Sequence, residues 1–488
     1  MGGMSMGGAS VGGASDSMAG TASSSTGGTA ADSTGGASSA GMSGGGASAG
    51  AAGNTNTGGA PCTFDVSATT SSAIPTVGSV DWSTTLAELD HAEIAYTLDD
   101  ASDSERNRAG RAPADVATSF SHTLLLGLKQ NRNYTFHIEA TSTHGVTCTS
   151  SDYHLTTGTL ANAPSITRTV TDASRAAGGF IITTGGFGST APVAIVDADG
   201  SVVWTAPAPT SASRARLDYE AKHLWVLAAN AQNGAADVRS ISLDGLTLVS
   251  TPSGLERAHH DLVAMPGGVI ATFVWSKSGI DQESDLVARS PDGSVKTLFH
   301  VGSNLYAGGP SAQGGGAHSY HCNSLAYYAA DQSFTIGDRN PSAFVKVKQS
   351  GELEWQFGGT CSGAKAKACI AGSWQVNHGH QLLDDGTFLF FNNTSMGSAN
   401  PSNADEFALS LSDTPQASSL KQWTGAAHEH SDTLGDVQRL PNGNTLVTFS
   451  NVGTIYELDP TWNVVQTLRA SSFGYSEWRE TLYGPPAR

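Results

Sequence analysis

Three histidines recur along this chain at nearly even spacing. His260, His321 and His378 each stand just before a run of apolar residues, and 61 and then 57 residues separate them. A further 57 residues lead to Gly435, which has the same place in a similar segment. The four segments read HDLVAMPGGVIATF, HCNSLAYYAADQSFTI, HGHQLLDDGTFLFF and GDVQRLPNGNTLVTF. Because sheets repeated around one axis bring equivalent positions together, the spacing predicts that three imidazoles converge on one site.

Turn signals divide the chain into hairpins from about residue 165 to about residue 475. Asp-Gly between apolar runs favours a hairpin, because the turn requires positive φ. Asp-Gly or Ser-Gly pairs occur at 199–200, 244–245, 292–293 and 350–351, and a second set of turns ends at Gly268, Gly386 and Gly443. Two hairpins in roughly 45–60 residues match a four-stranded propeller blade. We therefore expect an all-β chain whose residues 164–488 form a six-bladed β-propeller, with blades starting near residues 177, 214, 260, 321, 378 and 435. A pair of β-sandwiches with long loops is the alternative.

Composition separates two further parts from this repeated body. Residues 1–60 are almost entirely Gly, Ser, Ala, Thr and Met, which offer too little apolar surface to offset the entropy of ordering, so we expect a disordered tether. Residues 61–163 are expected to form a small β-sandwich. Tyr134 and Phe136 alternate along one face of an expected strand, and the spacing of Leu128 and Tyr134 resembles a fibronectin type III domain. Such modules are usually spacers, so we assign this one no chemistry.

The chain is acidic, with 43 acidic and 25 basic residues and a formal charge of −18. An acidic surface repels phosphate backbones, so we expect no nucleic acid partner. The sequence contains no apolar run of membrane-spanning length and no visible signal peptide. The Gly/Ser-rich tether nevertheless resembles the stalk after the lipid-anchoring cysteine of bacterial surface lipoproteins. We therefore expect a place in the bacterial cell envelope, either periplasmic, surface-tethered or secreted, with any lipid anchor outside the sequence given; the oligomeric state stays open.

The five cysteines suit two disulfides and one thiol. Cys361 and Cys369 enclose a short polar loop, and Cys62 and Cys148 bracket the expected sandwich. Both pairs would form in an oxidising compartment, whereas the alternative is that all are reduced small residues. Cys322 is left over next to a histidine. A Cys–His nucleophile is the weaker alternative there, since neighbours in a strand point to opposite faces.

Arg339 ends the strand expected after His321. Its planar guanidinium suits two oxygens of a sulfate, phosphate or carboxylate, so an arginine beside three histidines predicts an oxyanion pocket. A metal site is the chemical alternative, because residues i and i+2 of a strand share a face and two histidines there can chelate. The histidine doublets are His259–His260, His378–His380 and His428–His430. The chain lacks HExxH and CxxC patterns and an acidic ligand in the HGH lead-in, so we expect no metal and no cofactor.

Five motifs follow one another between residues 250 and 483. They are the HHD of AHHDLVAMPGG, the HxNS of HCNSLAYYAADQSF, the RN of GDRNPSAFVKV followed by GELEWQFGG, HGHQLLDDGTFLFFNN, and GDVQRLPNGNTLVTFSNVGTIYELD with a final WRETLY. In this order they resemble the motifs of the bacterial aryl-sulfate sulfotransferases. The resemblance implies a six-bladed propeller that moves a sulfuryl group from an aryl sulfate to a phenol. It also implies a transiently sulfated histidine, with no nucleotide donor.

Carried over by motif, the sulfated nucleophile falls on His378. His260, His321 and Arg339 fall on the positions that hold and polarise the sulfuryl oxygens. Substrate-binding contacts are expected from His259, His380, Asn323 and Asn340. A neutral imidazole is a competent nucleophile near pH 7, and preformed N–H donors would meet the charge on the transferred oxygens. A protonated histidine of this group would give a proton to the leaving phenolate and later take one from the acceptor.

The segment around His378 departs from the family pattern, in which the histidine usually follows Gln and precedes an acidic residue. Here Asn377, Gly379 and His380 surround it. His380 is therefore an alternative nucleophile, and His378 lacks the acidic neighbour that would fix its tautomer. Two other functions stay open: a non-catalytic propeller that binds an anionic ligand or partner, and a metal-dependent hydrolase. The natural donor and acceptor depend on the loops over the channel mouth, and the sequence does not identify them.

Overall fold

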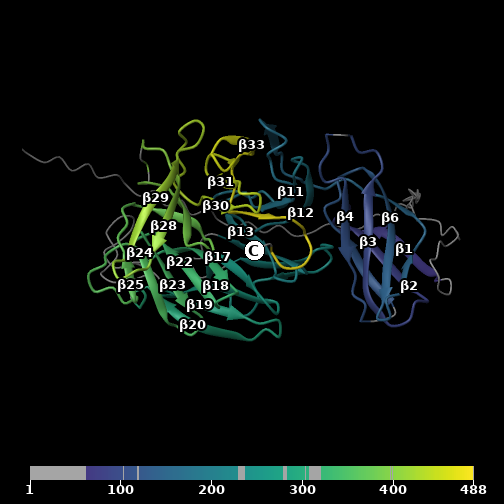
Figure 1. The fold of residues 1–488 in the computed structure, drawn as a ribbon, viewed down its shortest axis with the longest axis horizontal. Helices are drawn as coiled ribbons and strands as arrows, with labels where there is room; N and C mark the ends of the chain where they lie inside the picture. The colour runs from purple at the N-terminus through teal and green to yellow at the C-terminus, as the bar shows by residue number, and fades with distance from the viewer. Residues whose placement is uncertain are drawn as a thin grey trace, which may run out of the picture. The chain divides into compact units, whose positions relative to one another are not determined.

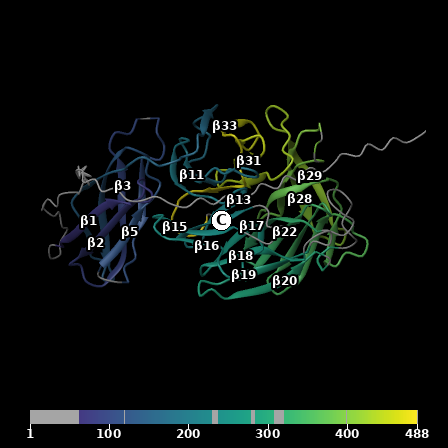
Figure 2. The same ribbon diagram turned by 180° about the vertical axis from the view of Figure 1, so that it is seen from behind.

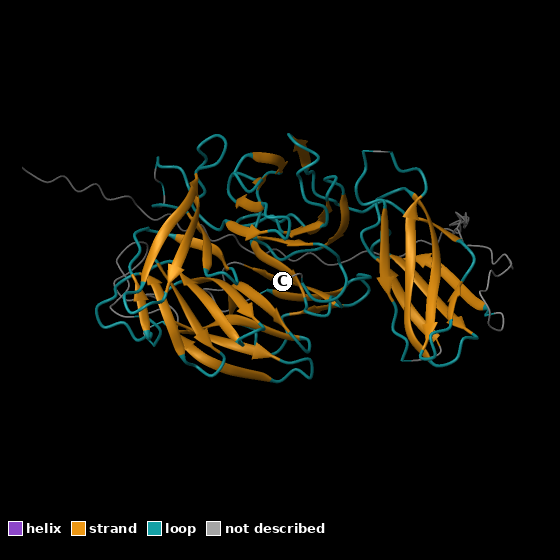
Figure 3. Ribbon diagram, in the orientation of Figure 1, coloured by secondary structure: helices purple, strands orange, loops and turns teal. Residues whose placement is uncertain are grey.

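The computed structural model describes residues 62–486, apart from residues 103, 118–119, 229–236, 278–282, 303, 307–319, 396 and 398. The predicted tether, residues 1–60, lies outside the described residues. Every regular element in the described part is a β-strand, as Figure 3 shows in orange. The prediction of an all-β chain is thus confirmed for this part. Within it, we find no helix suited to crossing a membrane.

Two sheets are formed by residues 64–156. One has the strand order β1-β2-β5, and the other has the order β4-β3-β6-β7 with β8 also paired to β6. The strands are β1 (Phe64–Thr70), β2 (Gly78–Thr84), β3 (Leu89–Leu98), β4 (Ala109–Pro113), β5 (Phe120–Leu125), β6 (Asn133–Ser142), β7 (Thr147–Thr149) and β8 (Tyr153–Thr156). Alternate residues of β6, including Tyr134, Phe136 and Ile138, are buried as expected. The predicted Cys62–Cys148 disulfide links the residues before β1 to β7.

Six sheets follow, and Figure 1 labels many of their strands. Each contains a strand that begins close to one of the six starts expected from the sequence, at residues 180, 212, 258, 322, 377 and 436. In hydrogen-bonded order, the strands are β12 (Val202–Ala206), β11 (Val193–Asp197), β10 (Phe180–Thr183) and β34 (Ser476–Arg479); β13 (Ala212–Leu217), β14 (His223–Ala228), β15 (Val238–Ser242) and β16 (Leu248–Ser250); β17 (Ala258–Met265), β18 (Val269–Lys277), β19 (Glu283–Arg289) and β20 (Val295–Val301); β21 (Cys322–Tyr328), β22 (Ser333–Asp338), β23 (Ala343–Lys348), β24 (Leu353–Gly358) and β25 (Ala368–Ile370); β26 (Asn377–Leu382), β27 (Thr387–Asn392), β28 (Asn403–Ser410) and β29 (Gln416–Trp423); and β30 (Asp436–Arg439), β31 (Thr445–Phe449), β32 (Thr454–Leu458), β33 (Val464–Arg469) and β9 (Thr167–Val170).

Glycines at the predicted turns have the positive φ that a tight hairpin requires. The turns Gly200, Gly245, Gly293 and Gly351 have φ of 82°, 74°, 87° and 91°, and Gly268, Gly386 and Gly443 have φ of 70°, 85° and 84°. Each lies between two paired strands of one sheet. Residues other than glycine rarely adopt this conformation, which explains why the hairpins could be read from the sequence. The predicted Cys361–Cys369 disulfide is also present, between β24 and β25.

One edge strand of each sheet contacts the corresponding strand of the next sheet. β13 contacts β17, β17 contacts β21, β21 contacts β26, β26 contacts β30, β30 contacts β34, and β34 contacts β13. The ends of this region are joined by pairing: β34 pairs with β10, and β9 pairs with β33. In Figures 1 and 2 the yellow C-terminal strands β31 and β33 accordingly lie beside the much earlier β11. Residues far apart in sequence therefore meet at the edge strands.

A buried arginine connects these edge strands. Arg214 of β13 donates from Nε and Nη2 to the two carboxylate oxygens of Asp261 in β17, at 2.7 and 3.2 Å, and from Nη1 to Asp436 of β30, at 2.8 Å. Its guanidinium lies 4.2 Å from the ring centroid of Tyr475. Asp261 also accepts the N–H of Leu325 in β21, at 2.9 Å. Burial opposes the charge of Arg214, but the two carboxylates raise its pKa, so it stays ionised.

Replacing Arg214 with leucine is expected to lower the free energy of unfolding by about 3–5 kcal/mol, because two buried carboxylates would lose their cation. Urea unfolding at neutral pH measures the change. Arg239→Leu is the control, since Arg239 pairs with the partly exposed Asp237 and should contribute a small fraction of that energy. Equal losses in the two variants would show that Arg214 has no special place in the fold.

Candidate active site

His260 lies between two other histidines. Its Nε2 is 2.8 Å from Nε2 of His321, and its Nδ1 is 2.8 Å from Nδ1 of His259. His259 in turn has Nε2 2.9 Å from Oγ of Ser284 and stacks on Trp275, with ring centroids 3.7 Å apart. The structure thus brings three of the predicted site histidines into one hydrogen-bonded chain that ends at a serine.

Arg339 and His378 lie near this chain. The backbone N–H of Arg339 donates to the carbonyl of His321, at 3.1 Å, and its charge adds to burial in lowering the pKa of His260, His321 and His378. His260 also contributes to lowering the pKa of His378. The ring centroid of His378 is 6.3 Å from that of Tyr475. The four residues predicted to act on a sulfuryl group therefore gather in one region, from four separate segments of the chain.

The histidines of this region are neutral at pH 7. Burial is the main cause: it lowers the pKa of His260 and of His378 to about 3, and that of His321 well below its ordinary value. Burial also lowers the pKa of Arg339, but an arginine remains charged. Each neutral imidazole offers one N–H donor and one lone pair. Among the described residues, Arg339 therefore lies near several neutral imidazoles, and the buried carboxyl of Asp338, whose pKa burial raises to about 6, lies next to it.

β-bulges place these side chains. The strand register shifts between His259 and Leu262, between Cys322 and Ser324, and between Asn377 and His380. His260 itself has φ of 62°, a conformation that residues other than glycine seldom adopt and that is typical of functional sites. A bulge re-aims the side chains beside it, so simple alternation along the strand no longer holds.

His380 therefore has other hydrogen-bonding partners than His378. Its Nδ1 is 2.9 Å from Oγ of Ser324 and its Nε2 is 2.7 Å from Oγ1 of Thr335. The ring stacks on Phe388, and burial lowers its pKa to about 4. Both ring nitrogens of His380 therefore join β26 to the neighbouring sheet.

Two of the three chelating pairs of the metal alternative are not formed, since only His259 and His260 lie beside each other. The two rings of the HGH segment have separate partners, and so do those of HEH: His428 lies 3.0 Å from Oγ1 of Thr424, whereas His430 lies 2.8 Å from Asp432. In the described part of the chain, no group of three or more His, Cys, Asp or Glu side chains is placed to hold a metal ion.

The two predicted asparagines and the free cysteine are buried. Asn323 donates from Nδ2 to the carbonyl of Asn377, at 2.6 Å, so it connects β21 to β26. The backbone N–H of Asn340 donates to Asp338, at 3.1 Å. The thiol of Cys322 donates to the same carboxylate, at 3.3 Å, and burial raises its pKa well above the ordinary value. Cys322 therefore stays a thiol, which disfavours a role as nucleophile.

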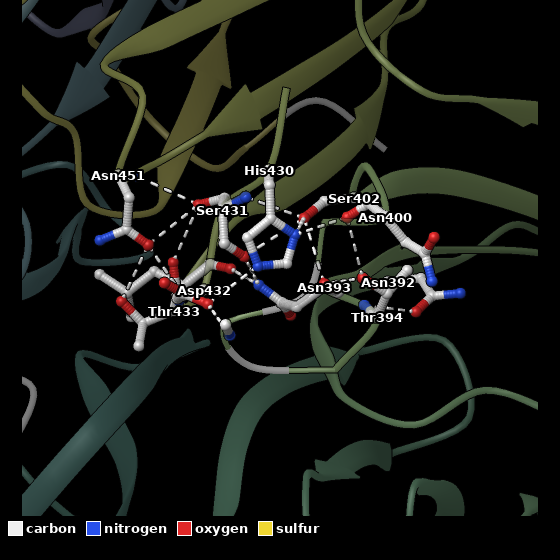
Figure 4. Close-up of polar contacts among 12 residues, drawn as sticks. Asn392, Asn393, Thr394, Asn400, Ser402, His430, Ser431, Asp432, Thr433 and Asn451 are labelled. Carbon is white, nitrogen blue, oxygen red and sulfur yellow. Dashed lines mark hydrogen bonds and ion pairs between the residues drawn. The ribbon is translucent and has the colours of Figure 1, made fainter. Parts of the chain in front are cut away.

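Asn393 is a site residue that sequence reasoning missed. Its Oδ1 lies 2.6 Å from Nδ1 of His378, and its Nδ2 donates to the carbonyls of Ser431 and Leu434, at 2.7 and 2.8 Å. Figure 4 shows this amide among the polar side chains that surround it. Asn393 directly follows the buried strand β27 and ends the segment FLFFNN. A polar pair at the end of a buried strand was the one signal in the sequence that pointed to it.

The glycine of the HGH segment is required by close packing. A Cβ on Gly379 would lie 2.0 Å from Oδ1 of Asp436, and its N–H donates to the carbonyl of Gly435, at 3.0 Å. A Cβ on Gly435 would lie 2.2 Å from the ring of Phe391. The fourth repeat position thus has no room for a histidine, because the ring of Phe391 in β27 packs directly against it.

Gly379→Ala is expected to lower the melting temperature by several degrees, because the added methyl would displace Asp436, the partner of Arg214. Thermal unfolding followed by circular dichroism measures the change. Gly178→Ala is the control, since a Cβ there would meet no heavy atom within 4 Å. Equal melting temperatures for the two variants would show that the contact with Asp436 does not require a glycine at position 379.

Comparison with solved structures finds distant likenesses. A protein of unknown function from Bacteroides caccae shares 14% identity, with a TM-score of 0.40, and the match covers 61% of this chain and 98% of that one. A putative 6-phosphogluconolactonase from Bacteroides uniformis shares 12% identity, with a TM-score of 0.39 and coverage of 80% and 99%. A streptogramin B lyase shares 12%, with a TM-score of 0.36 and coverage of 62% and 86%. At these TM-scores the likeness gives no ground for assigning an activity.

No curated protein matches the chain. One family does match: residues 309–471 fit the family described as Arylsulfotransferase (ASST). The matched residues include His321, Arg339 and His378, whereas His259 and His260 precede them. This result confirms the resemblance seen in the sequence motifs: residues 309–471 match the arylsulfotransferase family.

Proposed function

We propose that this protein transfers a sulfuryl group from an aryl sulfate to a phenolic acceptor through a sulfated His378. The observation that carries the proposal is the placement of His378: a buried, neutral imidazole beside Arg339 and the His260–His321 pair, within a segment of the arylsulfotransferase family. A single cation among neutral donors suits a monoanionic sulfate ester.

The proposal includes the architecture and location expected from the sequence. The six sheets would be the blades of a β-propeller, which the succession of contacts among their edge strands supports. The two sheets formed by residues 64–156 would be the fibronectin type III-like module. The two disulfides support an oxidising place such as the bacterial cell envelope.

In the first step, Nε2 of His378 attacks the sulfur of the aryl sulfate. The N–S bond forms, the bond from sulfur to the phenolic oxygen breaks, and the phenolate leaves. Arg339, with N–H groups of the histidine chain, would hold the non-bridging oxygens through both steps. In the second step the oxygen of the acceptor phenol attacks the same sulfur and releases the neutral ring of His378, while the phenol gives up its proton.

The chain of three histidines restricts where protons reside. Three neutral rings share two N···N contacts, and each contact holds one proton, so all rings donate in one direction. Among the described residues, Nδ1 of His321 has no hydrogen-bonding partner. When Ser284 donates to His259, this nitrogen carries a hydrogen; when the direction reverses, it carries a lone pair. The same chain can thus present a donor to a sulfuryl oxygen or an acceptor to a phenol. The negative charge of a bound sulfate ester would favour protonation of the chain, which then serves as acid and later as base.

Incubation with 4-nitrophenyl sulfate and phenol tests the proposal. We expect phenol-dependent release of nitrophenol, and intact mass after the donor alone should show one added SO₃. His378→Gln should lose at least about a thousandfold in turnover and lose the adduct, because the nucleophile is gone. His380→Gln is the matched control and should keep the adduct. No turnover of any aryl sulfate with a panel of phenols would favour a non-catalytic, anion-binding protein, and loss of activity with a chelator would favour a metal-dependent hydrolase.

The rate of adduct formation is expected to change less than about threefold between pH 8 and pH 5, because the pKa of His378 is about 3 and its ring stays neutral throughout. A histidine with an ordinary pKa near 6.5 would lose about thirtyfold at pH 5, when most of its rings are protonated. Single-turnover samples, adjusted to one alkaline pH before nitrophenol is read, give the rate. A thirtyfold fall that follows a pKa between 6 and 7 and persists in Asp338→Asn, which removes the neighbouring carboxyl of pKa about 6, would contradict a buried, neutral nucleophile.

A further inference from the structure

The orientation of the Asn393 amide is determined by its surroundings. Its Nδ2 faces two backbone carbonyls, those of Ser431 and Leu434, at 2.7 and 2.8 Å. A carbonyl oxygen only accepts hydrogen bonds, so the NH₂ group must point toward them and Oδ1 must point away. The reversed amide would set three oxygens against one another in a fully buried place. Asn393 therefore presents an oxygen, and not a nitrogen, to His378.

This oxygen determines which nitrogen of His378 carries the hydrogen. Oδ1 of Asn393 has no hydrogen to donate, so at 2.6 Å Nδ1 of His378 must be the donor. A neutral ring has one hydrogen, and burial keeps this ring neutral by lowering its pKa to about 3. The lone pair is then on Nε2. Among the described residues, Nε2 of His378 has no hydrogen-bonding partner, whereas Nδ1 is fully engaged.

The segment that supplies these carbonyls makes further hydrogen bonds, and Figure 4 shows those of Ser431 and His430. The N–H of Ser431 donates to Oγ of Ser402, at 2.9 Å, and Oγ of Ser431 donates to Asn451, at 3.2 Å. The neighbouring His430 lies between the carbonyl of Asn400 and the carboxylate of Asp432, each at 2.8 Å. The segment that carries the carbonyls is thus tied to residues beside both β28 and β31. The acceptors for Asn393 are preorganised before any substrate binds.

We propose that Asn393 is a positioning residue that holds His378 in the Nδ1–H tautomer, so that Nε2 is the nitrogen that attacks sulfur. The role in attack rests on the proposed function, whereas the tautomer does not. Asn393 fixes the tautomer of His378, as the missing acidic neighbour would do, but it carries no charge. A carboxylate would favour the imidazolium, which has no lone pair, but an amide orients the ring and leaves it neutral.

The other groups near His378 reinforce this neutral state. Arg339, from the turn after β22, and His260, from β17, both contribute to lowering its pKa, and Tyr475, before β34, presents an aromatic ring. His378 in turn contributes to lowering the pKa of His321, so the two rings oppose protonation of each other. A carboxylate at position 393 would thus place a negative charge in direct contact with the His378 ring and would favour its protonation.

Long-range ¹H–¹⁵N spectra of the full chain with ¹⁵N-labelled histidine test the tautomer without requiring activity. His378→Gln identifies the His378 signals by their loss. At pH 7 we expect the Nδ1–H pattern in the wild type and a shift toward Nε2–H or a mixture in Asn393→Ala. An Nε2–H pattern in the wild type, or an unchanged pattern in Asn393→Ala, would overturn the proposal.

Single-turnover kinetics test the consequence for attack. Asn393→Ala should form the sulfated adduct about 10–100-fold more slowly, with little change in KM for the donor, because orientation and not binding is lost. Asn393→Asp should be slow at low pH and recover as pH rises, since its carboxylate holds a proton on the ring. Asn392→Ala is the control: this adjacent amide binds Asp405, at 2.9 Å, and should leave the rate unchanged.

The outcomes separate the two proposals. Equal slowing in Asn393→Ala and Asn392→Ala would show a structural effect and overturn the positioning role. If the wild type forms no adduct, the proposed function fails, and the spectra still decide whether Asn393 sets the tautomer.

Discussion

The pairing of one buried arginine with two buried carboxylates sets the geometry on which the rest of the structure depends. Arg214 binds Asp261 and Asp436 and lies over the ring of Tyr475. Charges this deep in a protein are tolerated only when they are paired and hydrogen-bonded, so the three edge strands that carry them must meet at this place. Asp261 directly follows His260, and Asp436 packs against Gly379, so the same pairing controls the positions of two site histidines.

Around this charged centre, the candidate site is largely uncharged. Arg339 is its cation, and the histidines are kept neutral by burial and by one another. Such an arrangement would suit the monoanionic sulfate ester of the proposed function, because an imidazole lone pair stays available for attack. The hydroxyl of Tyr475 donates to the carbonyl of Asn323, at 2.6 Å, and Asn323 donates to the carbonyl of Asn377. Asn377, which precedes His378, is therefore linked through Asn323 and Tyr475 to Arg214, and a displacement of either residue would move the other.

Much of the fold could be predicted because its signals are local. The glycine turns require positive φ at residues such as Gly200 and Gly386, and both disulfides join cysteines whose spacing is visible in the sequence. The meeting of His260 and His321 also followed from their repeated positions. The partner of His378 did not: Asn393 is 15 residues away, and its amide is oriented by carbonyls from another loop. The bulge between Asn377 and His380 removed the alternation on which the alternative of an HGH metal chelate rested.

The sequence by itself determined an all-β chain, the hairpin turns, the cysteine pairs, the spacing that brings histidines to equivalent places, and the motifs of the arylsulfotransferase family. These depend on backbone conformation and periodicity, which short segments encode. Only the tertiary structure decided which nitrogen of His378 is free, which partners occupy His380, and why Gly435 ends the histidine series. Those outcomes depend on hydrogen bonds and close packing between different sheets, and the energy of such contacts exists only once the sheets have assembled.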